Sequence, residues 1–144
     1  MHPFELLRID HVVLRVSDPE RSLAFYRDVL GCGIARRRDD LGLIHLRCGA
    51  SMIDLVDIHG KLGQPGGAAA GEQARNVDHV CLRIEPFDEA ALVAHLARHG
   101  LQPTGAAQSN FGAEGDGPSI YLRDPDGNTI ELKGPSPTVG MIDP

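Results

Sequence analysis

The pattern of apolar and polar positions along the chain predicts two successive units, each with one strand, one helix and three further strands. The first stretch, 9–16, combines aliphatic residues with a few polar ones and is typical of a strand buried on one face. Ser17-Asp18-Pro19-Glu20 follows and has the character of a helix start, with a capping side chain and a proline in the first turn. Apolar residues at helical spacing extend this helix over about 19–30, and Gly31 ends it.

The same order of elements occurs twice. Three strand-like runs follow the first helix, at about 33–38, 42–48 and 51–57. The second unit begins with a strand and a helix and continues with three strands, at about 77–84, 88–99, 102–108, 118–123 and 128–133. The segment 58–76 between the units is rich in Gly and Ala, which is typical of a mobile linker that could also act as a lid. We therefore expect one domain over 1–144, with module 1 at about 7–57, the linker at about 58–76, module 2 at about 77–133 and a C-terminal tail at 134–144.

An eight-residue motif at the first strand is repeated at the strand that begins the second unit. Ile9-Asp10-His11-Val12-Val13-Leu14-Arg15-Val16 recurs as Val77-Asp78-His79-Val80-Cys81-Leu82-Arg83-Ile84. Because side chains alternate along a strand, His11 and Arg15 share one face, and His79 and Arg83 share the corresponding face. The opposite, aliphatic face is expected to pack on the helix. The two arginines are candidate binding groups for an anionic part of a substrate.

A second, less exact repeat places one carboxylate between aliphatic residues in a later strand of each unit. Asp54 lies within Met52-Ile53-Asp54-Leu55-Val56, and Glu131 lies within Thr129-Ile130-Glu131-Leu132-Lys133. A carboxylate that faces a half-buried cavity is costly unless it is paired or bound to metal. Two imidazoles and two carboxylates form an N2O2 ligand set that accepts Ni, Mn, Fe, Co or Zn. The sequence therefore predicts a divalent metal site whose ligands are His11, Asp54, His79 and Glu131. A further histidine, His45, falls in a strand without a second signal beside it.

Composition narrows the function classes. The formal charge of −6 disfavours nucleic acid, and an aromatic content of 4% without Trp provides few stacking platforms. The chain has no apolar run as long as a membrane span and no secretory signal at 1–8, so a cytoplasmic protein is expected. Cys32, Cys48 and Cys81 are an odd number without paired spacing, which favours reduced, packed thiols over a disulfide framework.

Four motifs together resemble the vicinal oxygen chelate superfamily, which includes glyoxalase I, extradiol dioxygenases, methylmalonyl-CoA epimerase, fosfomycin-resistance transferases and bleomycin-binding proteins. They are Asp10-His11-Val12, Ser22-Leu23-Ala24-Phe25-Tyr26 with Val29-Leu30-Gly31, Asp78-His79-Val80, and Tyr121-Leu122-Arg123-Asp124-Pro125-Asp126-Gly127-Asn128-Thr129-Ile130-Glu131. The resemblance implies an α+β fold in which two tandem βαβββ modules form an open eight-stranded mixed β-barrel. It also implies a metal inside the barrel, a small-molecule substrate chelated through oxygen, and a homodimer.

Within the superfamily, glyoxalase I is the nearest mechanistic model. The resemblance implies a metal-dependent lyase or isomerase in which Glu131 is the catalytic base, moving a proton next to a metal-chelated carbonyl. It also implies that Arg15 binds a substrate carboxylate. Two positions depart from the glyoxalase I pattern: Asp54 is shorter than the usual glutamate, and Ile58 stands where an asparagine of the glutathione site is expected.

Two alternatives remain open at this stage. An extradiol dioxygenase would use His11, His79 and Glu131 as iron ligands, and its substrate-binding tyrosine is matched by Tyr121, ten positions before the glutamate. The histidine that those enzymes carry a few residues before that tyrosine is absent from 112–114. The second alternative is a non-catalytic drug-binding resistance protein with an empty site. Whether the barrel closes within one chain or across a dimer is also open.

Overall fold

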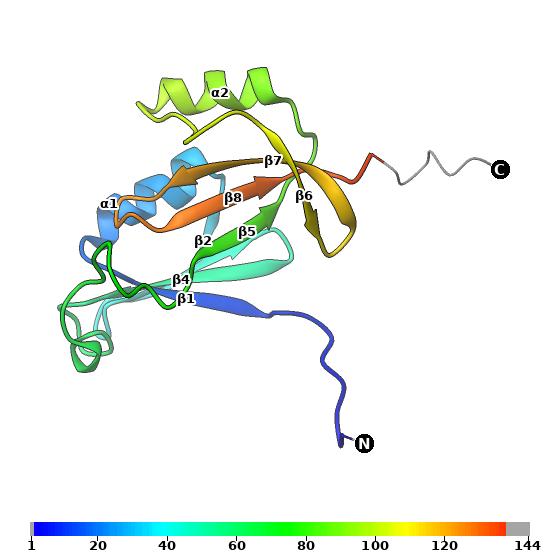
Figure 1. Cartoon of the computed structure of the whole chain (residues 1–144). Coiled ribbons are helices and arrows are strands. Elements are labelled where there is room, and N and C mark those ends of the chain that lie inside the picture. The colour runs from blue at the N-terminus through cyan, green and yellow to red at the C-terminus, as the bar shows by residue number, and fades with distance from the viewer. Residues whose placement is uncertain (1, 138–144) are drawn as a thin grey trace. The chain divides into compact units, whose positions relative to one another are not determined.

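The computed structural model describes residues 2–137, so the last part of the predicted tail, 138–144, lies outside the described residues. The chain divides into two compact units, with the boundary between Ala69 and Ala70, inside the predicted linker. Each unit contains one four-stranded mixed sheet and one main helix (Figure 1). The predicted α+β class with two βαβββ modules is therefore confirmed. None of the helices within the described residues is long and apolar enough to cross a bilayer.

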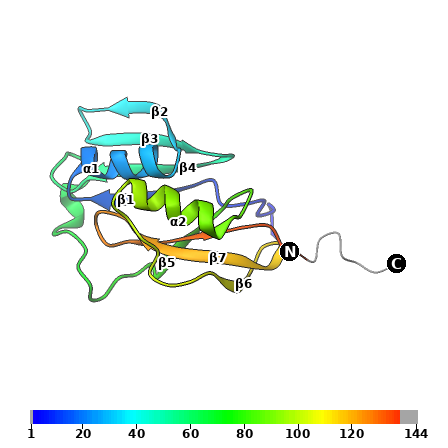
Figure 2. The ribbon, with the colours of Figure 1, turned by 90° about the horizontal axis from the view of Figure 1, so that it is seen from above.

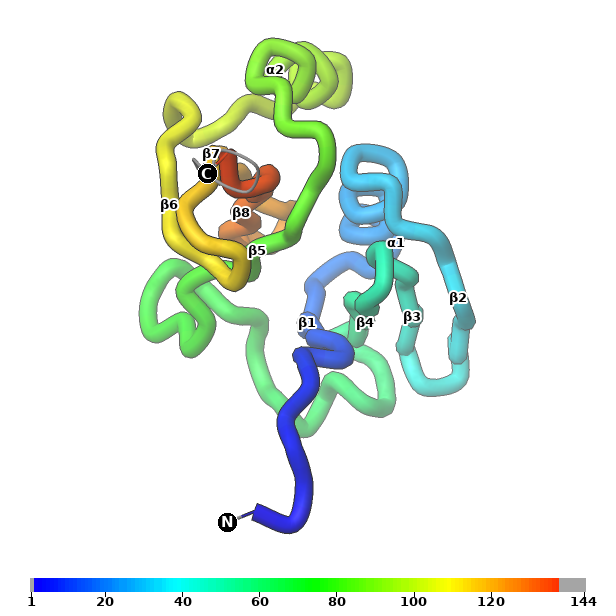
Figure 3. The backbone as a smooth tube through the Cα atoms, turned by 90° about the vertical axis from the view of Figure 1, so that its right-hand side faces the viewer, coloured from blue at the N-terminus to red at the C-terminus, as the bar shows by residue number. Residues whose placement is uncertain are grey.

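Unit 1 carries the sheet with the strand order β1-β4-β3-β2. Its strands lie at β1 His11–Val16, β2 Gly33–Arg38, β3 Leu43–Cys48 and β4 Ser51–Asp57. β1 runs parallel to β4, and the other neighbours are antiparallel. The succession of these four strands is visible in the tube view (Figure 3). The central position of β4 places Asp54 between two neighbouring strands.

The helix of unit 1 begins where the sequence predicts it and changes character after one turn. The Asp18 side chain accepts a hydrogen bond from the amide of Arg21 at 3.2 Å, and Pro19 opens α1, Pro19–Leu23. The segment then continues as the π-helix η1, Ala24–Val29, which buries Phe25, Tyr26 and Val29. The predicted helix over 19–30 is confirmed in extent, with wider turns in its second half.

Unit 2 repeats the arrangement with the strand order β5-β8-β7-β6. Its elements are β5 His79–Arg83, α2 Glu89–Arg98, β6 Gln108–Gly112, β7 Gly115–Arg123 and β8 Thr129–Lys133. The Asp88 side chain caps α2 by accepting from the amide of Ala91 at 3.1 Å. The helix lies along one face of its own sheet (Figure 2). The central strand here is β8, which carries Glu131, as β4 carries Asp54.

One predicted strand of the second unit was wrong. The expected strand near 102–108 is irregular chain, and the strand lies instead at Gln108–Gly112. Pro103 has no amide hydrogen for a ladder, and its neighbour Thr104 bonds the carbonyl of Tyr121 at 2.9 Å. A tight hairpin then pairs Gly112 with Gly115, whose φ of 97° suits glycine. β7 consequently begins before the predicted position 118.

Candidate functional site

The first half-site, defined as His11, His45 and Asp54, lies on one face of the unit 1 sheet. The parallel register sets Val13 opposite Asp54, and His11 lies two residues before Val13, on the same side of the strand. The antiparallel register sets His45 directly opposite Asp54. Strand pairing therefore sets His45 directly beside Asp54, and it places His11 on the same sheet face, two positions along β1 from the residue opposite Asp54.

The second half-site, defined as His79, Cys81, Tyr121 and Glu131, has the same construction in unit 2. Cys81 lies opposite Glu131 across β5 and β8, and Tyr121 lies opposite Glu131 across β7 and β8. His79 lies two residues before Cys81, as His11 lies two residues before Val13. Tyr121 consequently occupies the position in unit 2 that His45 occupies in unit 1.

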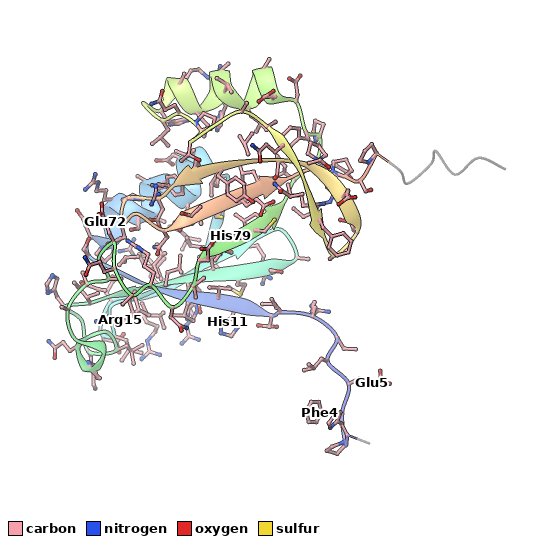
Figure 4. The ribbon with its side chains drawn as sticks, in the orientation of Figure 1. Phe4, Glu5, His11, Arg15, Glu72 and His79 are labelled. Carbon is pink, nitrogen blue, oxygen red and sulfur yellow. The ribbon has the colours of Figure 1, made fainter. Side chains whose placement is uncertain are left out.

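Each repeated histidine is oriented by the aspartate that precedes it. His11 Nδ1 lies 2.7 Å from Asp10 Oδ1, and His79 Nδ1 lies 2.8 Å from Asp78 Oδ1. The hydrogen bond to Asp10 raises the pKa of His11 above its ordinary value. When Nδ1–H donates to a carboxylate, Nε2 is left to act as a metal ligand, which is the usual arrangement at histidine metal sites. His11 and His79 are labelled on β1 and β5 in Figure 4.

Asp54 has one anchored and one unpartnered oxygen. Its side chain is buried, and Oδ2 lies 3.1 Å from His45 Nδ1. Oδ1 is also buried and has no hydrogen-bond partner. A buried acceptor left unsatisfied costs about 1–3 kcal/mol, and more when it is charged. A metal ion bound at Oδ1 would satisfy this oxygen, so the residues present fit the ligand role predicted for Asp54.

Glu131 is buried among polar neighbours. Its Oε1 lies 3.1 Å from Nε2 of His79, the nitrogen left by the Asp78 contact. The rings of Tyr121 and His79 meet edge to face, with centroids 5.5 Å apart. Desolvation of the phenol, and then its hydrogen bond to Glu131, raise the pKa of Tyr121. Three of the four predicted site residues of unit 2, His79, Tyr121 and Glu131, thus contact one another.

The thiol of Cys81 lies beside the same carboxylate. Partial burial, followed by the negative charge of Glu131, raises the pKa of Cys81 to about 11. A thiol with such a pKa is protonated at neutral pH and a weak nucleophile. Cys81 is therefore a poor candidate for a nucleophile, although the residue is exposed in unit 2.

Arg15 holds the start of the predicted linker. Its guanidinium donates to the carbonyls of Gly63 at 2.8 Å and Ala68 at 3.2 Å, and also to that of Gly67. Figure 4 shows the labelled Arg15 side chain beside this loop. A Cβ at Gly66 would lie 2.4 Å from Arg15 Nε, so the glycine allows the close approach. Three carbonyls of the stretch 63–68 therefore share one guanidinium, and the mobility expected for 58–76 stays a prediction.

The charge of Arg83 is compensated by carboxylates. Nε donates to Glu114 Oε2 at 2.6 Å, and a terminal nitrogen donates to Glu85 Oε1 at 2.8 Å. The strand parity predicted the face of Arg83 but not these partners, because Glu114 lies in the β6–β7 hairpin. A substrate anion would have to compete with both carboxylates for this side chain.

Two side chains of these faces, His45 and Lys133, were not predicted as site residues. His45 contacts Asp54, and Lys133 is 4% exposed, with its ammonium donating to the carbonyl of Gly115 at 3.0 Å. Strand alternation offered a signal for both, because His45 lies opposite Asp54 in a hairpin and Lys133 lies two residues after Glu131. The signal for Lys133 is local to its strand, whereas the signal for His45 needs the hairpin register, which is not known from the sequence.

Neither unit completes a metal site by itself. Among residues 2–137, no three or more His, Cys, Asp or Glu side chains are grouped so as to hold a metal ion. Each unit provides one oriented imidazole and one buried carboxylate on the same sheet face. The four-ligand site therefore stays a prediction from the sequence.

Tandem βαβββ modules with a matched histidine and carboxylate define a class of duplicated α+β proteins. Residues 8–132 match the family model of the Glyoxalase/Bleomycin resistance protein/Dioxygenase superfamily. Because the match spans most of the sequence, the chain belongs to this superfamily, as its motifs suggest.

Three relatives illustrate the range of the superfamily. Virulence protein STM3117 of Salmonella typhimurium is 32% identical over 130 residues, covering 87% of this chain and 82% of its own length. Its crystal structure superposes with a TM-score of 0.74 at 28% identity, over 92% of this chain and 100% of that one. An ethylmalonyl-CoA/methylmalonyl-CoA epimerase of Cereibacter sphaeroides is 26% identical over 132 residues, covering 88% and 96%. Lactoylglutathione lyase from Agrobacterium tumefaciens shares the fold, with a TM-score of 0.62 at 22% identity, over 88% and 92%.

Proposed function

We propose that this protein is a metal-dependent enzyme of the isomerase or lyase type, which moves a proton at a carbon next to a carbonyl. The observation that carries the proposal is the buried, unpartnered Oδ1 of Asp54. That oxygen sits on the same sheet face as His11, and Glu131 and His79 repeat the arrangement in unit 2. Relatives that include an epimerase support the same reaction type.

His11, Asp54, His79 and Glu131 would hold the metal once the two half-sites meet. Asp10 and Asp78 orient the two imidazoles, and His45 anchors the second oxygen of Asp54. When bound, a divalent metal would polarise a substrate carbonyl as a Lewis acid. The half-sites could meet in a barrel closed within one chain or across a homodimer, which light scattering and mixed-variant complementation would distinguish.

Glu131 is the proposed proton carrier. A general base must be held in place by its neighbours and must lie close to the proton that it takes. The Glu131 carboxylate is buried beside His79, and Tyr121 next to it offers a hydroxyl to the substrate or to the carboxylate. Glu131 would take a proton from the substrate carbon and return it to the same or a neighbouring carbon.

Substrate recognition in this proposal involves the two arginines. Arg15 Nε is buried without a hydrogen-bond partner, so one N–H of its guanidinium is left for an anionic group. Arg83 would bind an anion only by exchanging a carboxylate partner. Two substrate classes suit a proton transfer of this kind: a 2-alkylmalonyl thioester and a glutathione hemithioacetal. Ile58 in place of a polar residue counts against the second class.

Deuterium exchange tests the proposal directly. Purified protein loaded with Mn, Co, Ni, Zn or Fe(II) is incubated in D2O with each substrate class, and mass spectrometry follows deuterium at the carbon next to the carbonyl. We expect exchange in one class, its loss in Glu131→Gln and its retention in Glu5→Gln, a matched change at an exposed glutamate. Bound metal without exchange in either class would contradict the proposal.

A dioxygenase is the second candidate. His79 and Glu131, which would be iron ligands, lie in contact, and Tyr121, the matched tyrosine of such enzymes, lies beside them. The free oxygen of Asp54 argues against it, since a fourth protein ligand would occupy a position that dioxygen chemistry needs open. Oxygen consumption by the Fe(II)-loaded protein with a catechol would favour this alternative. Absence of stoichiometric metal after loading would favour a non-catalytic binding protein.

A cytoplasmic location is part of our proposal and agrees with the three free thiols.

A further inference from the structure

Cys32 and Cys48 are neighbours in unit 1, although sixteen positions separate them in the sequence. The register of β2 and β3 pairs Gly33 with Arg47, so one step further along the ladder Cys32 lies opposite Cys48. Their thiols are hydrogen-bonded to each other, and both are free. The spacing of the two cysteines predicts no pairing, because nothing in it indicates this register.

The backbone at this position suits a disulfide. Directly opposite residues of an antiparallel pair have Cα atoms about 4.5–5.5 Å apart, and disulfides span Cα distances of about 4.4–6.8 Å. The amide of Cys32 donates to the carbonyl of Tyr26 at 2.9 Å instead of to Cys48. The Cys32 amide therefore makes no ladder hydrogen bond to Cys48. Antiparallel pairs without such hydrogen bonds have the shorter of the two Cα–Cα distances. Oxidation would need little movement of the main chain.

The two thiols differ in exposure and acidity. Cys32 is buried, whereas Cys48 is only half-buried at the end of β3. The hydrogen bond from Cys32 lowers the pKa of Cys48 to about 7, and the same contact, followed by burial, raises the pKa of Cys32. The thiolate is the reactive form of cysteine. Cys48 is consequently the thiol that an oxidant can both reach and react with.

We propose that Cys32 and Cys48 form a redox-active dithiol that a peroxide converts into a cross-strand disulfide. Cys48 Sγ attacks one peroxide oxygen, the O–O bond breaks, and the leaving hydroxide takes a proton to become water, which leaves Cys48 as a sulfenic acid. Cys32 Sγ then attacks Cys48 Sγ, the S–O bond breaks, and the hydroxide leaves with the Cys32 proton as a second water. In total, two thiols and one hydrogen peroxide give one disulfide and two waters.

This dithiol is separate from the proposed metal chemistry. Neither cysteine belongs to a half-site, and the reaction needs no residue of unit 2. Its product would tie the residue that precedes β2, a strand that pairs with β3 alone among the described residues, to the strand that carries His45. The proposal therefore holds or fails independently of the proposed function.

Peptide mapping of the wild-type protein tests the proposal. Protein treated with hydrogen peroxide at pH 7.5 is alkylated, digested with trypsin without reduction and analysed by mass spectrometry. We expect peptide 28–36 joined to peptide 48–61, while Cys81 in peptide 76–83 remains alkylated. Without peroxide, iodoacetamide should label Cys48 faster than Cys81 by about tenfold or more, because the gain in thiolate fraction exceeds the accompanying loss of nucleophilicity.

Single serine variants distinguish the roles of the three thiols. Cys81→Ser should form the same disulfide as the wild type. Cys48→Ser should form none, and Cys32→Ser should leave a Cys48 sulfenic acid that dimedone traps. If peroxide oxidises Cys81 first in the wild-type protein, or gives only disulfides between chains, the proposal is overturned whatever the variants do.

Discussion

His45 Nδ1 lies 3.1 Å from Oδ2 of Asp54, while the other oxygen of that buried carboxylate has no partner. The contact fixes the carboxylate through one oxygen and leaves the second one for a ligand. In unit 2, Tyr121 stands at the matching position beside Glu131. Each central strand therefore presents a carboxylate whose neighbour on the antiparallel strand is an aromatic side chain able to hydrogen-bond.

Removal of Asp54 separates a four-ligand site from a three-ligand site. In Asp54→Ala we expect metal affinity to fall by tenfold or more. Loss of a residue that only hydrogen-bonds to a metal ligand lowers metal affinity by about 10–100-fold, and loss of a ligand itself should cost at least as much. Competition with a fluorescent chelator measures this affinity. Asp39→Ala, a change at an exposed carboxylate, is the control. Unchanged affinity in Asp54→Ala would leave only His11, His79 and Glu131 as ligands.

Replacement of His45 tests its role as a positioning residue. His45→Phe keeps a ring but loses the contact to Oδ2, so metal affinity should fall by about tenfold. His45→Gln retains a donor and should recover part of that loss. Circular dichroism of the apo-proteins serves as the control for folding. Equal affinities in the wild type and both variants would show that His45 does not position Asp54.

Arg15 should control the order of the segment that follows β4. In Arg15→Met the carbonyls of Gly63, Gly67 and Ala68 lose their donor, at about 0.5–1.5 kcal/mol for each hydrogen bond. Local opening, and with it tryptic cleavage after the exposed Lys61, should accelerate by about tenfold or more. Gel analysis of a digestion time course measures the rate.

The control for this experiment removes an arginine from the surface of the same unit. Arg37→Met loses only exposed ion pairs to Glu20 and Asp39. Cleavage after Lys61 should therefore keep its wild-type rate in this variant. Equal rates in Arg15→Met and Arg37→Met would contradict the anchoring role of Arg15.

Truncation of Leu55 should destabilise the core of unit 1. This side chain is fully buried on the face of β4 opposite Asp54, so Leu55→Ala should reduce the free energy of unfolding by about 2–5 kcal/mol. Leu6→Ala, at a residue that is 90% exposed, should change it by less than about 0.5 kcal/mol. Urea denaturation followed by circular dichroism compares them. Similar losses in both variants would show that the aliphatic face of β4 is not core.

Thiol alkylation should depend on pH with a different profile for each unit. The Cys48 pKa of about 7 lies below the ordinary value, so its labelling rate should rise between pH 6 and 8 and then level off. Cys81, with a pKa of about 11, should still be gaining reactivity at pH 10. Quenched labelling with mass spectrometry gives both profiles. In Cys32→Ser the Cys48 profile should change, since its main hydrogen-bond partner is altered.

Much of the fold follows from local patterns. Alternation marked the strands that carry His11, Asp54, His79 and Glu131, and capping residues with glycine stops marked both helices. The failure near 102–108 has a local cause, because Pro103 and Gly105 interrupt an apolar run that otherwise has strand composition. The candidate site was predicted in part: its repeated histidines and carboxylates have distinctive neighbours, whereas His45 and Lys133 have none.

The sequence by itself determined the duplication, the order of the elements and the face on which each repeated ligand candidate lies, because alternation and capping act over a few residues. Only the tertiary structure showed that His45 meets Asp54, that Cys32 meets Cys48, and that Arg15 holds the carbonyls of 63–68. These contacts join positions that are 9 to 53 residues apart in the sequence. Strand register and loop path decide which distant residues meet, and both depend on packing of the whole unit.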